Sequence, residues 1–230
     1  MNLFAVLKRI LIGALLLVAT PAPAAGHGYL AQPPARNVVH NSNYCPQCLN
    51  AGGPWKVFGD QPVARYGVCG DAIDEPKDHE SGGKYGSTSH AVFKRFDSFV
   101  AKVTLTANHL GRWSLRLCRR RPDDSSTPET QRCFDAHVLR RVDGSGPFTY
   151  VLPGVDTYEV WYRLPRRVVC EHCVLQWFYE TGNSCTPPGT PPGFANSQLG
   201  VCFAPGTWVY PEQFWNCADV RINFRNRNKI

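Results

Sequence analysis

Ten cysteines limit the folds open to this chain more than any other feature of its sequence. Their number is even, and they follow an N-terminal segment typical of a secretory signal, which implies an oxidising compartment. We therefore expect up to five disulfides in a loop-rich domain. The cysteines stand at positions 45, 48, 69, 118, 133, 170, 173, 185, 202 and 217.

Some pairings can be argued from spacing. Two Cys-x-x-Cys motifs, which begin at positions 45 and 170, superficially resemble the two halves of a zinc ribbon. Their separation in the sequence is much longer than such a site uses, so disulfides are favoured. Cys118 and Cys133 are expected to pair, because they flank the polar loop 119–132. The other pairings do not follow from the sequence.

Residues 1–26 are typical of a signal peptide. Two basic residues precede the apolar run Ile10–Ala19, which is too short to span a bilayer comfortably. Ala24 and Gly26 would occupy the −3 and −1 positions of a cut before His27. A signal anchor is disfavoured because the run ends in prolines, whereas a cut one or two residues earlier is left open by the pattern.

Residues 27–230 are expected to form one secreted, soluble, monomeric domain that does not associate with membranes, because 204 residues can bury a core. The signal segment holds two of the 25 lysines and arginines and none of the 18 acidic residues, so the formal charge falls from +7 to +5. The arginine pairs and triplets are scattered and lack interleaved aromatic residues. Nucleic-acid binding is therefore not expected.

The periodicity after residue 90 predicts strands. Apolar residues alternate with polar ones, and β-branched and aromatic residues are frequent. Short strands separated by Gly and Pro turns predict an all-β fold, an immunoglobulin- or fibronectin-III-like antiparallel β-sandwich. Residues 31–90 read as a long disulfide-bonded loop region with short helices. The expected strands are Phe99–Ala107, Trp113–Cys118, Thr157–Arg163, Cys173–Tyr179 and Cys217–Phe224.

His27 becomes chemically special if the signal peptide is removed before it. Its free amine and near ring nitrogen would then close a small chelate ring on a metal, and a second histidine would complete a planar site of three nitrogens. Copper suits such a set. His109 follows the strand 99–107 and falls on the face of Ala107 by period two. On this evidence alone, His109 is better explained as a residue that ends the strand in a turn.

Five segments, in order along nearly the whole mature chain, carry a family resemblance. They are His27-Gly-Tyr-Leu with Pro33-Pro-Ala-Arg36, Tyr66-Gly-Val-Cys-Gly-Asp71, Leu105-Thr-Ala-Asn-His-Leu-Gly111, Leu175-Gln-Trp-Phe-Tyr-Glu-Thr-Gly-Asn-Ser184 and Phe214-Trp-Asn-Cys-Ala-Asp-Val220. The chain resembles lytic polysaccharide monooxygenases, and auxiliary activity family 15 is the nearest match. That family is found in arthropods, other invertebrates, oomycetes and some viruses.

The resemblance implies a copper site called a histidine brace. His27 matches the terminal histidine, and His109 matches the second ligand. Ala107 matches the small residue beside one axial face of the copper. Phe214 matches the Tyr or Phe of the opposite face, and a register shifted by one residue would place Trp215 there. The apolar parity of the last strand independently favours Phe214, although plain core packing explains the same parity.

The resemblance also implies a role for Gln176 and the reaction that the enzyme catalyses. Gln176 corresponds to a Gln or Glu that hydrogen-bonds near the open copper position, with an ordinary strand residue as the alternative. The enzyme class uses an external electron donor and O2 or H2O2 to oxidise C1 or C4 of a glycosidic linkage. The implied partner is an insoluble polysaccharide, with chitin as the first choice and cellulose as the alternative.

The implied substrate surface is flat and surrounds the copper. Tyr29, Tyr44, Trp55 and Tyr66 are candidates to stack on or hydrogen-bond to sugars, although each is equally explained as a packed residue. A non-catalytic chitin- or glycan-binding protein on the same scaffold is the main competing hypothesis. A copper carrier or cuticle protein, and a disulfide-rich hydrolase, are weaker ones, and no Gly-x-Ser-x-Gly motif is present.

Overall fold

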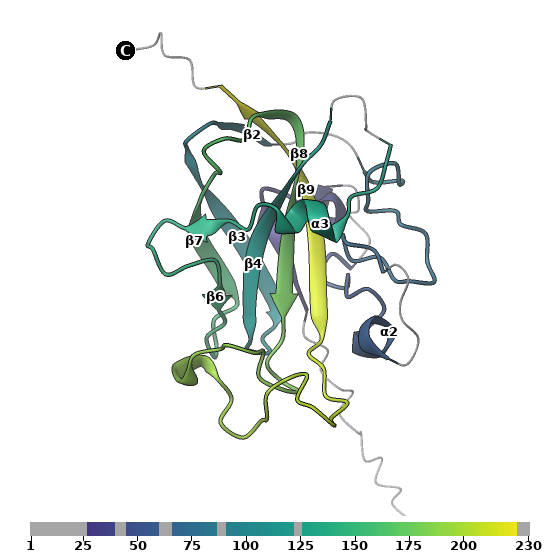
Figure 1. The fold of residues 1–230 in the computed structure, drawn as a ribbon, viewed down its shortest axis with the longest axis vertical. Coiled ribbons are helices and arrows are strands. Elements are labelled where there is room, and N and C mark those ends of the chain that lie inside the picture. Colours follow the sequence, from purple (N-terminus) through teal and green to yellow (C-terminus); the bar gives the residue numbers. More distant parts are fainter. Residues whose placement is uncertain (1–26, 40–44, 60–65, 87–90, 122–125, 225–230) are drawn as a thin grey trace, which may run out of the picture.

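The computed structural model describes residues 27–39, 45–59, 66–86, 91–121 and 126–224. Within them, two β-sheets pack face to face (Figure 1), and the expected β-sandwich is confirmed. All pairings between strands are antiparallel except β2 with β9, which is parallel. The strands of the first sheet are, in order across it, β1 (His27–Gln32), β3 (Ser98–Ala107), β7 (Thr157–Arg163) and β5 (Arg140–Arg141). The strands of the second sheet are, in order, β2 (Ala91–Lys94), β9 (Gln213–Asn223), β8 (Cys170–Glu180), β4 (Arg112–Arg119) and β6 (Thr149–Tyr150).

The helices are short, as expected. They are α1 (Arg36–Val39), α2 (Pro54–Phe58), α3 (Gln131–Asp135) and a 3₁₀ turn, Pro192–Phe194. None of the helices in the described part of the chain has the length and apolar character needed to cross a membrane.

The alternation of apolar and polar residues along the strands correctly predicts which side chains are buried in the core. Phe99, Ala101, Val103 and Leu105 alternate along β3 and are buried against the second sheet. Strand β9 begins at Gln213, four residues before the expected start, and is buried on both faces along almost its whole length. The sandwich core covers one face of β9, and the loop region covers the other.

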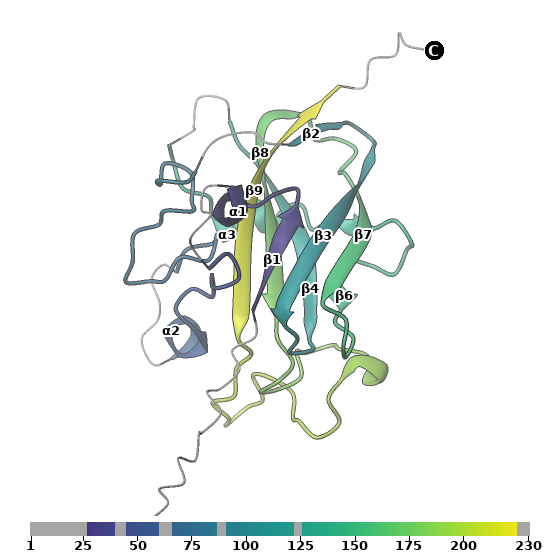
Figure 2. The same ribbon diagram turned by 180° about the vertical axis from the view of Figure 1, so that it is seen from behind.

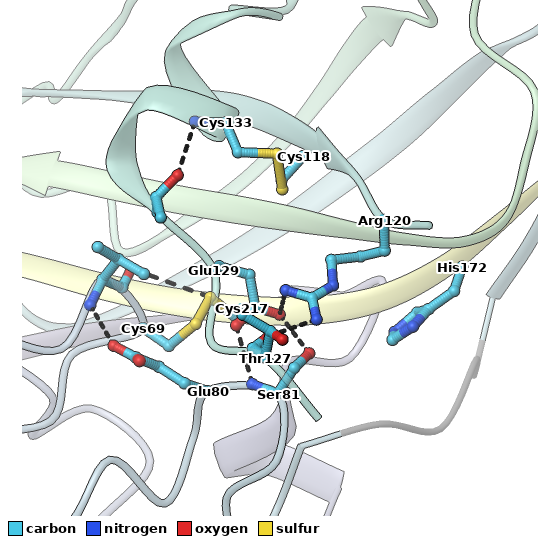
Figure 3. A network of polar contacts seen from close by, with 12 residues as sticks. Cys69, Glu80, Ser81, Cys118, Arg120, Thr127, Glu129, Cys133, His172 and Cys217 are labelled. Atoms are coloured by element: carbon cyan, nitrogen blue, oxygen red, sulfur yellow. Dashed lines mark hydrogen bonds and ion pairs between the residues drawn. A yellow bond between two sulfur atoms is a disulfide. The ribbon is translucent and has the colours of Figure 1, made fainter. Parts of the chain in front are cut away.

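The layer over the outer face of β8 and β9 forms a second, smaller core. It contains residues from the loop region, from α3 and from the strands themselves: Val68, Cys69, Cys118, Phe134, Val174 and Cys217. The loop region 45–86 lacks long apolar runs, so this small core needs covalent and polar support. Figure 3 shows the two disulfides and the polar contacts that supply it.

All ten cysteines are paired, and the expected five disulfides are present. Cys118 pairs with Cys133, as predicted, and thereby holds α3 against β4. Each Cys-x-x-Cys motif closes on itself, which removes the zinc-ribbon alternative. The long-range bonds are Cys69–Cys217, between the loop region and β9, and Cys185–Cys202, within the loop before β9.

A buried ion network ties α1 to β9. Arg36 is fully buried, and its Nη2 lies 2.6 Å from Asp219 Oδ1 and 3.1 Å from Glu129 Oε1. Ser81 donates its backbone N–H to Glu129 at 2.8 Å (Figure 3). Burial opposes ionisation of Asp219, but hydrogen bonds from Arg36 and His172 outweigh it and hold its pKa below the usual value. Paired in this way, the charges anchor the loop layer.

Candidate metal centre

Strand pairing places His27 at one end of the sandwich. In the antiparallel pair of β1 and β3, His27 lies opposite Ala107, the last residue of β3. Gly28 allows β1 to lie close to the core, because a Cβ there would come within 2.6 Å of Leu105 Cδ2. Figure 2 shows β1 and β3 side by side.

The turn after β3 orients His109. Asn108 Nδ2 donates to the carbonyls of Leu152 and Val155, both at 2.8 Å. Gly182 donates its N–H to the His109 carbonyl, also at 2.8 Å. The turn is thus bound to two other loops, through the Asn108 side chain and the His109 carbonyl. These tertiary contacts, and not the strand alone, set the direction of the imidazole.

The imidazole of His109 contacts Asn183, and the charges of Glu212 and His27 act on it. Its Nδ1 lies 2.5 Å from Nδ2 of Asn183. Burial lowers its pKa, the carboxylate of Glu212 acts in the opposite direction, and His27 lowers it further. The geometry comes from the strand pairing, which puts His27 opposite Ala107, two residues before His109. A lowered pKa keeps His109 neutral, which is the form that binds metals.

Phe214 lies beside His27. Its ring is fully buried and meets the His27 ring edge-on, with centroids 6.0 Å apart and an interplanar angle of 71°. Tyr179 stacks behind it at 6.0 Å, and the Tyr179 hydroxyl donates to the Leu110 carbonyl. Trp215 faces the other side of β9, against Tyr66 at 5.2 Å. The structure thus brings Phe214, and not Trp215, to the histidines.

The donor set fits a metal bound by nitrogen. The described residues contain no cluster of three or more His, Cys, Asp and Glu side chains able to hold a metal. Two imidazoles and a free His27 amine would suffice for copper. An Asn amide can present either its oxygen or its NH2 group. With the oxygen of Asn183 facing His109 Nδ1, that nitrogen carries the proton, and Nε2 is left as the ligand atom.

Gln176 does not join this group. Its side chain is fully buried in the outer layer, where Nε2 donates to the Val68 carbonyl at 2.8 Å and to Gln131 Oε1 at 3.0 Å. The reason is strand parity, because Trp177 and Tyr179 occupy the face of β8 that looks toward the sandwich core. The hydrogen bonds of Gln176 therefore anchor the loop layer and α3.

The aromatic candidates separate into different environments. Trp55, on α2, has 65% of its surface exposed. Tyr66 packs on Trp215, and Tyr29 is half-buried on β1. Tyr44 lies outside the described residues. Trp55 is thus the most exposed of the three candidates that the structure describes.

Sequence reasoning missed several groups at this end of the molecule. Asn183 lies within a segment quoted for the family resemblance, but nothing in the sequence aims it at His109. Glu212, two residues before Phe214, accepts a hydrogen bond from Asn50 Nδ2 at 2.8 Å. Trp208, in the loop before β9, is 65% exposed. The only available signal was their position close to Phe214 or to the resembling segments.

The sequence profile of the family described as "lytic polysaccharide mono-oxygenase, cellulose-degrading" matches residues 27–220. The chain belongs to the lytic polysaccharide monooxygenase family. The match begins at His27 and spans both histidines and Phe214. Membership of this family implies copper and oxidative action on polysaccharides.

Solved structures agree with this assignment. One similar structure is a lytic polysaccharide monooxygenase of auxiliary activity family 15 from Thermobia domestica, in the Cu(I) state. It has 33% sequence identity and a TM-score of 0.70, with 86% of this chain and 99% of that chain covered. A chitin-binding domain from Burkholderia pseudomallei shares the fold, with 12% identity, a TM-score of 0.50, and coverage of 87% and 100%. Comparison with curated protein sequences gave no match.

Proposed function

We propose that this lytic polysaccharide monooxygenase is a secreted, monomeric enzyme that cleaves crystalline chitin, with cellulose as the alternative substrate. One observation carries the proposal: His27, Ala107, His109 and Phe214 meet at one end of the sandwich. Three strands and one turn, distant in the sequence, converge there. Core packing alone does not require two histidines beside a buried phenylalanine at a strand end.

Each residue has a defined part in holding the metal. After cleavage behind Gly26, the His27 amine and ring would supply two nitrogens, and the His109 ring would supply the third. Ala107 and Phe214 carry no donor atoms in their side chains, so they would line the metal site without binding the metal. Bound copper supplies redox chemistry between Cu(II) and Cu(I), with an external donor of electrons and O2 or H2O2 as oxidant.

Glu212 contributes charge rather than a ligand. Its carboxylate acts on His109 so as to favour positive charge at that ring. The same field would favour a bound cation in that neighbourhood. Asn50 holds this carboxylate through its hydrogen bond, and the Glu212 carbonyl accepts from the Thr181 N–H at 3.0 Å. The group is thus fixed in place before a metal binds.

The same end offers a surface for an insoluble substrate. Phe58 of α2 packs on Phe203 and Tyr210, with ring centroids 5.1 and 5.0 Å apart, so α2 and the loop before β9 form one continuous surface. Trp55 and Trp208 stand on these two segments, each 65% exposed. Exposed indole rings are suited to contact with flat sugar rings. Figure 1 shows α2 and this loop beside the start of β9.

The test is product analysis on both polymers. The mature protein, starting at His27 and loaded with one equivalent of copper, is incubated with chitin or cellulose, with and without ascorbate. We expect oxidised oligosaccharides from at least one polymer, seen by mass spectrometry, only when ascorbate and copper are both present. Fragmentation of these oligosaccharides by tandem mass spectrometry will distinguish oxidation at C1 from oxidation at C4, because the two kinds of product are isomers of equal mass.

Two results would overturn the proposal in different ways. Copper binding no tighter than micromolar, with intact binding to chitin, would indicate a non-catalytic glycan-binding protein. Tight copper binding without oxidised products from either polymer would indicate a copper carrier. The metal-stripped protein is the control in both experiments.

A further inference from the structure

We propose a second binding surface for a carboxylated polysaccharide on the outer face of the sheet edge formed by β7 and β5. We call it the basic edge and define it by Arg140, Trp161, Arg163 and Arg166. This proposal does not depend on the copper site, because it rests on other residues and on another end of the sandwich.

The first observation is a pair of like charges. Arg140 on β5 stands directly opposite Arg163 on β7. Side chains of opposed residues lie on the same face of a sheet, where like charges destabilise the pairing. The neighbouring Arg141 is neutralised by Asp143, at 2.5 Å.

The charges of the basic edge lack acidic partners among the described residues. None of those residues forms an ion pair with Arg140, Arg163 or Arg166. Arg163 donates from Nη2 to the Val142 carbonyl at 3.0 Å, and its other guanidinium N–H groups remain available to a ligand. A bound carboxylate would relieve the repulsion between Arg140 and Arg163, because a guanidinium and a carboxylate form parallel hydrogen bonds.

The second observation is that the surface is hollowed around these arginines. Two adjoining cavities, of about 490 and 330 Å3, share Arg163, Leu164 and Arg166 as lining residues. Arg140 and His137 line the smaller one, and Phe96 lines the larger one. A polymer chain that enters these hollows would meet guanidinium groups and apolar walls together.

The third observation is an exposed aromatic ring beside the charges. Trp161 has 55% of its surface exposed and lies two residues before Arg163 on the same face of β7. Two residues of a strand span about 6.6 Å, which is close to the dimension of one sugar ring. An indole face next to a guanidinium suits a sugar ring that carries a carboxylate. Stacking on Trp161 and ionic contact with Arg163 would then act on one residue of the polymer.

The basic edge lies far from the copper site. Arg163 pairs with Ser98, the first residue of β3, whereas Ala107 is the last. Ten residues of strand span about 30 Å, and Figure 2 shows β3 and β7 side by side along this length. An acidic polysaccharide held here would leave the copper end free. The basic edge would thus tether the enzyme to an acidic matrix that surrounds its insoluble substrate.

The test compares two polymers with the same backbone. Binding of the mature protein to polygalacturonate and to its fully methyl-esterified form is measured by affinity electrophoresis. We expect retardation by the acid form only. Arg140→Gln with Arg163→Gln should weaken binding at least about tenfold, and Trp161→Ala about fivefold.

The matched control is Arg119→Gln with Arg132→Gln. These two arginines are also exposed and are not part of the basic edge, so the net charge changes by the same amount. Control binding should stay within about twofold of the parent protein. Equal losses in both double variants would overturn the proposal in favour of unspecific charge attraction. Binding to dextran sulfate but not to polygalacturonate would overturn the assignment of a carboxylated ligand. Circular dichroism spectra and thermal unfolding like those of the parent protein show that the variants are folded.

Discussion

Glu80 is a buried carboxyl group whose ionisation opposes folding. Burial raises its pKa to about 7, and the charges of Glu129 and Asp71 add to this, while a hydrogen bond from the Val68 N–H acts against it. In an unfolded chain the pKa of Glu is about 4.3. Between these values the folded protein holds a proton that the unfolded chain has lost, so the free energy of unfolding must fall as pH rises from about 4.3 to 7.

Glu80→Gln should remove this part of the pH dependence. An amide keeps an oxygen that accepts from the Val68 N–H but cannot ionise. We expect the variant to be more stable than the parent by about 1 kcal/mol at pH 7.5 and to lose this advantage at pH 4.5. Urea unfolding of the parent and the variant at pH 7.5 and at pH 4.5 measures this difference in stability. Glu75→Gln, at an exposed position, is the control, and a difference that does not change with pH would contradict the argument.

His109 is the residue whose loss separates a metal site from a turn. His109→Ala removes one of the three expected nitrogens, so we expect the dissociation constant for Cu(II) to rise at least about a hundredfold in calorimetric titration. His137→Ala should leave copper affinity unchanged, because His137 lines a cavity at the basic edge. Equal affinity in the two variants would mean that His109 only completes a turn.

At the scale of elements, the position of β1 depends on Gly28. A Cβ at residue 28 would approach Leu105 Cδ2 at 2.6 Å, the Thr104 carbonyl at 3.1 Å and Trp177 Cη2 at 3.2 Å. Backbone and a buried indole cannot move freely, so Gly28→Ala should displace β1 and with it His27. We expect a loss of about 1–3 kcal/mol in stability, with weaker copper binding.

Calorimetry and urea unfolding on the same preparation measure both effects of Gly28→Ala. Gly193→Ala serves as the matched control, because a Cβ there would meet nothing within 4 Å. If Gly28→Ala loses stability but keeps copper affinity, β1 does not position the ligand.

The loop before β9 is an element held by one disulfide. Cys185–Cys202 closes 17 residues, and hydrogen bonds between Thr186 and its neighbours Gly200 and Cys202 continue the connection. Replacing both cysteines by alanine should lower stability by about 3 kcal/mol through the entropy of the unfolded loop. Because Trp208 lies in this loop, binding to chitin or cellulose should weaken while copper affinity is retained.

A pull-down with the insoluble polymer and a copper titration distinguish the two effects of this double replacement. Cys45→Ala with Cys48→Ala is the comparison, since that disulfide spans only three residues. Should both double variants bind the polymer equally, the loop before β9 is not part of the substrate surface.

At the scale of the whole molecule, the metal centre depends on where the chain begins. A protein that starts at Pro21 retains residues 21–26, so the His27 nitrogen is part of a peptide bond and is not a free amine. We expect it to fold as the mature protein does but to bind Cu(II) at least about a hundredfold more weakly. Circular dichroism checks the fold, and titration checks the affinity. Equal affinities would show that the amine is not a ligand.

The sequence alone determined what depends on local pattern. Alternation along a strand identified the inward face of β3, and the loop between Cys118 and Cys133 identified one disulfide. His27 and His109 emerged as candidates because one stands at an expected terminus and the other at a strand end. Strand pairing places His27 opposite Ala107, two residues before His109. These features could be predicted because each depends on residues close in the sequence, the most distant being the Cys118–Cys133 pair, which is 15 residues apart.

Only the tertiary structure decided which distant side chains meet. Gln176, which the family resemblance placed near the metal, lies against Val68 and Gln131, because it stands on the face of β8 that points away from the sandwich core. Asn183 contacts His109, and the charge of Glu212 acts on it, from loops whose course no periodicity describes. The opposition of Arg140 and Arg163 arises from the pairing of two strands, one of them only two residues long. Such contacts depend on how the sheets and loops pack. The packing energy comes from contacts between segments that are distant in the sequence, so no single segment determines it.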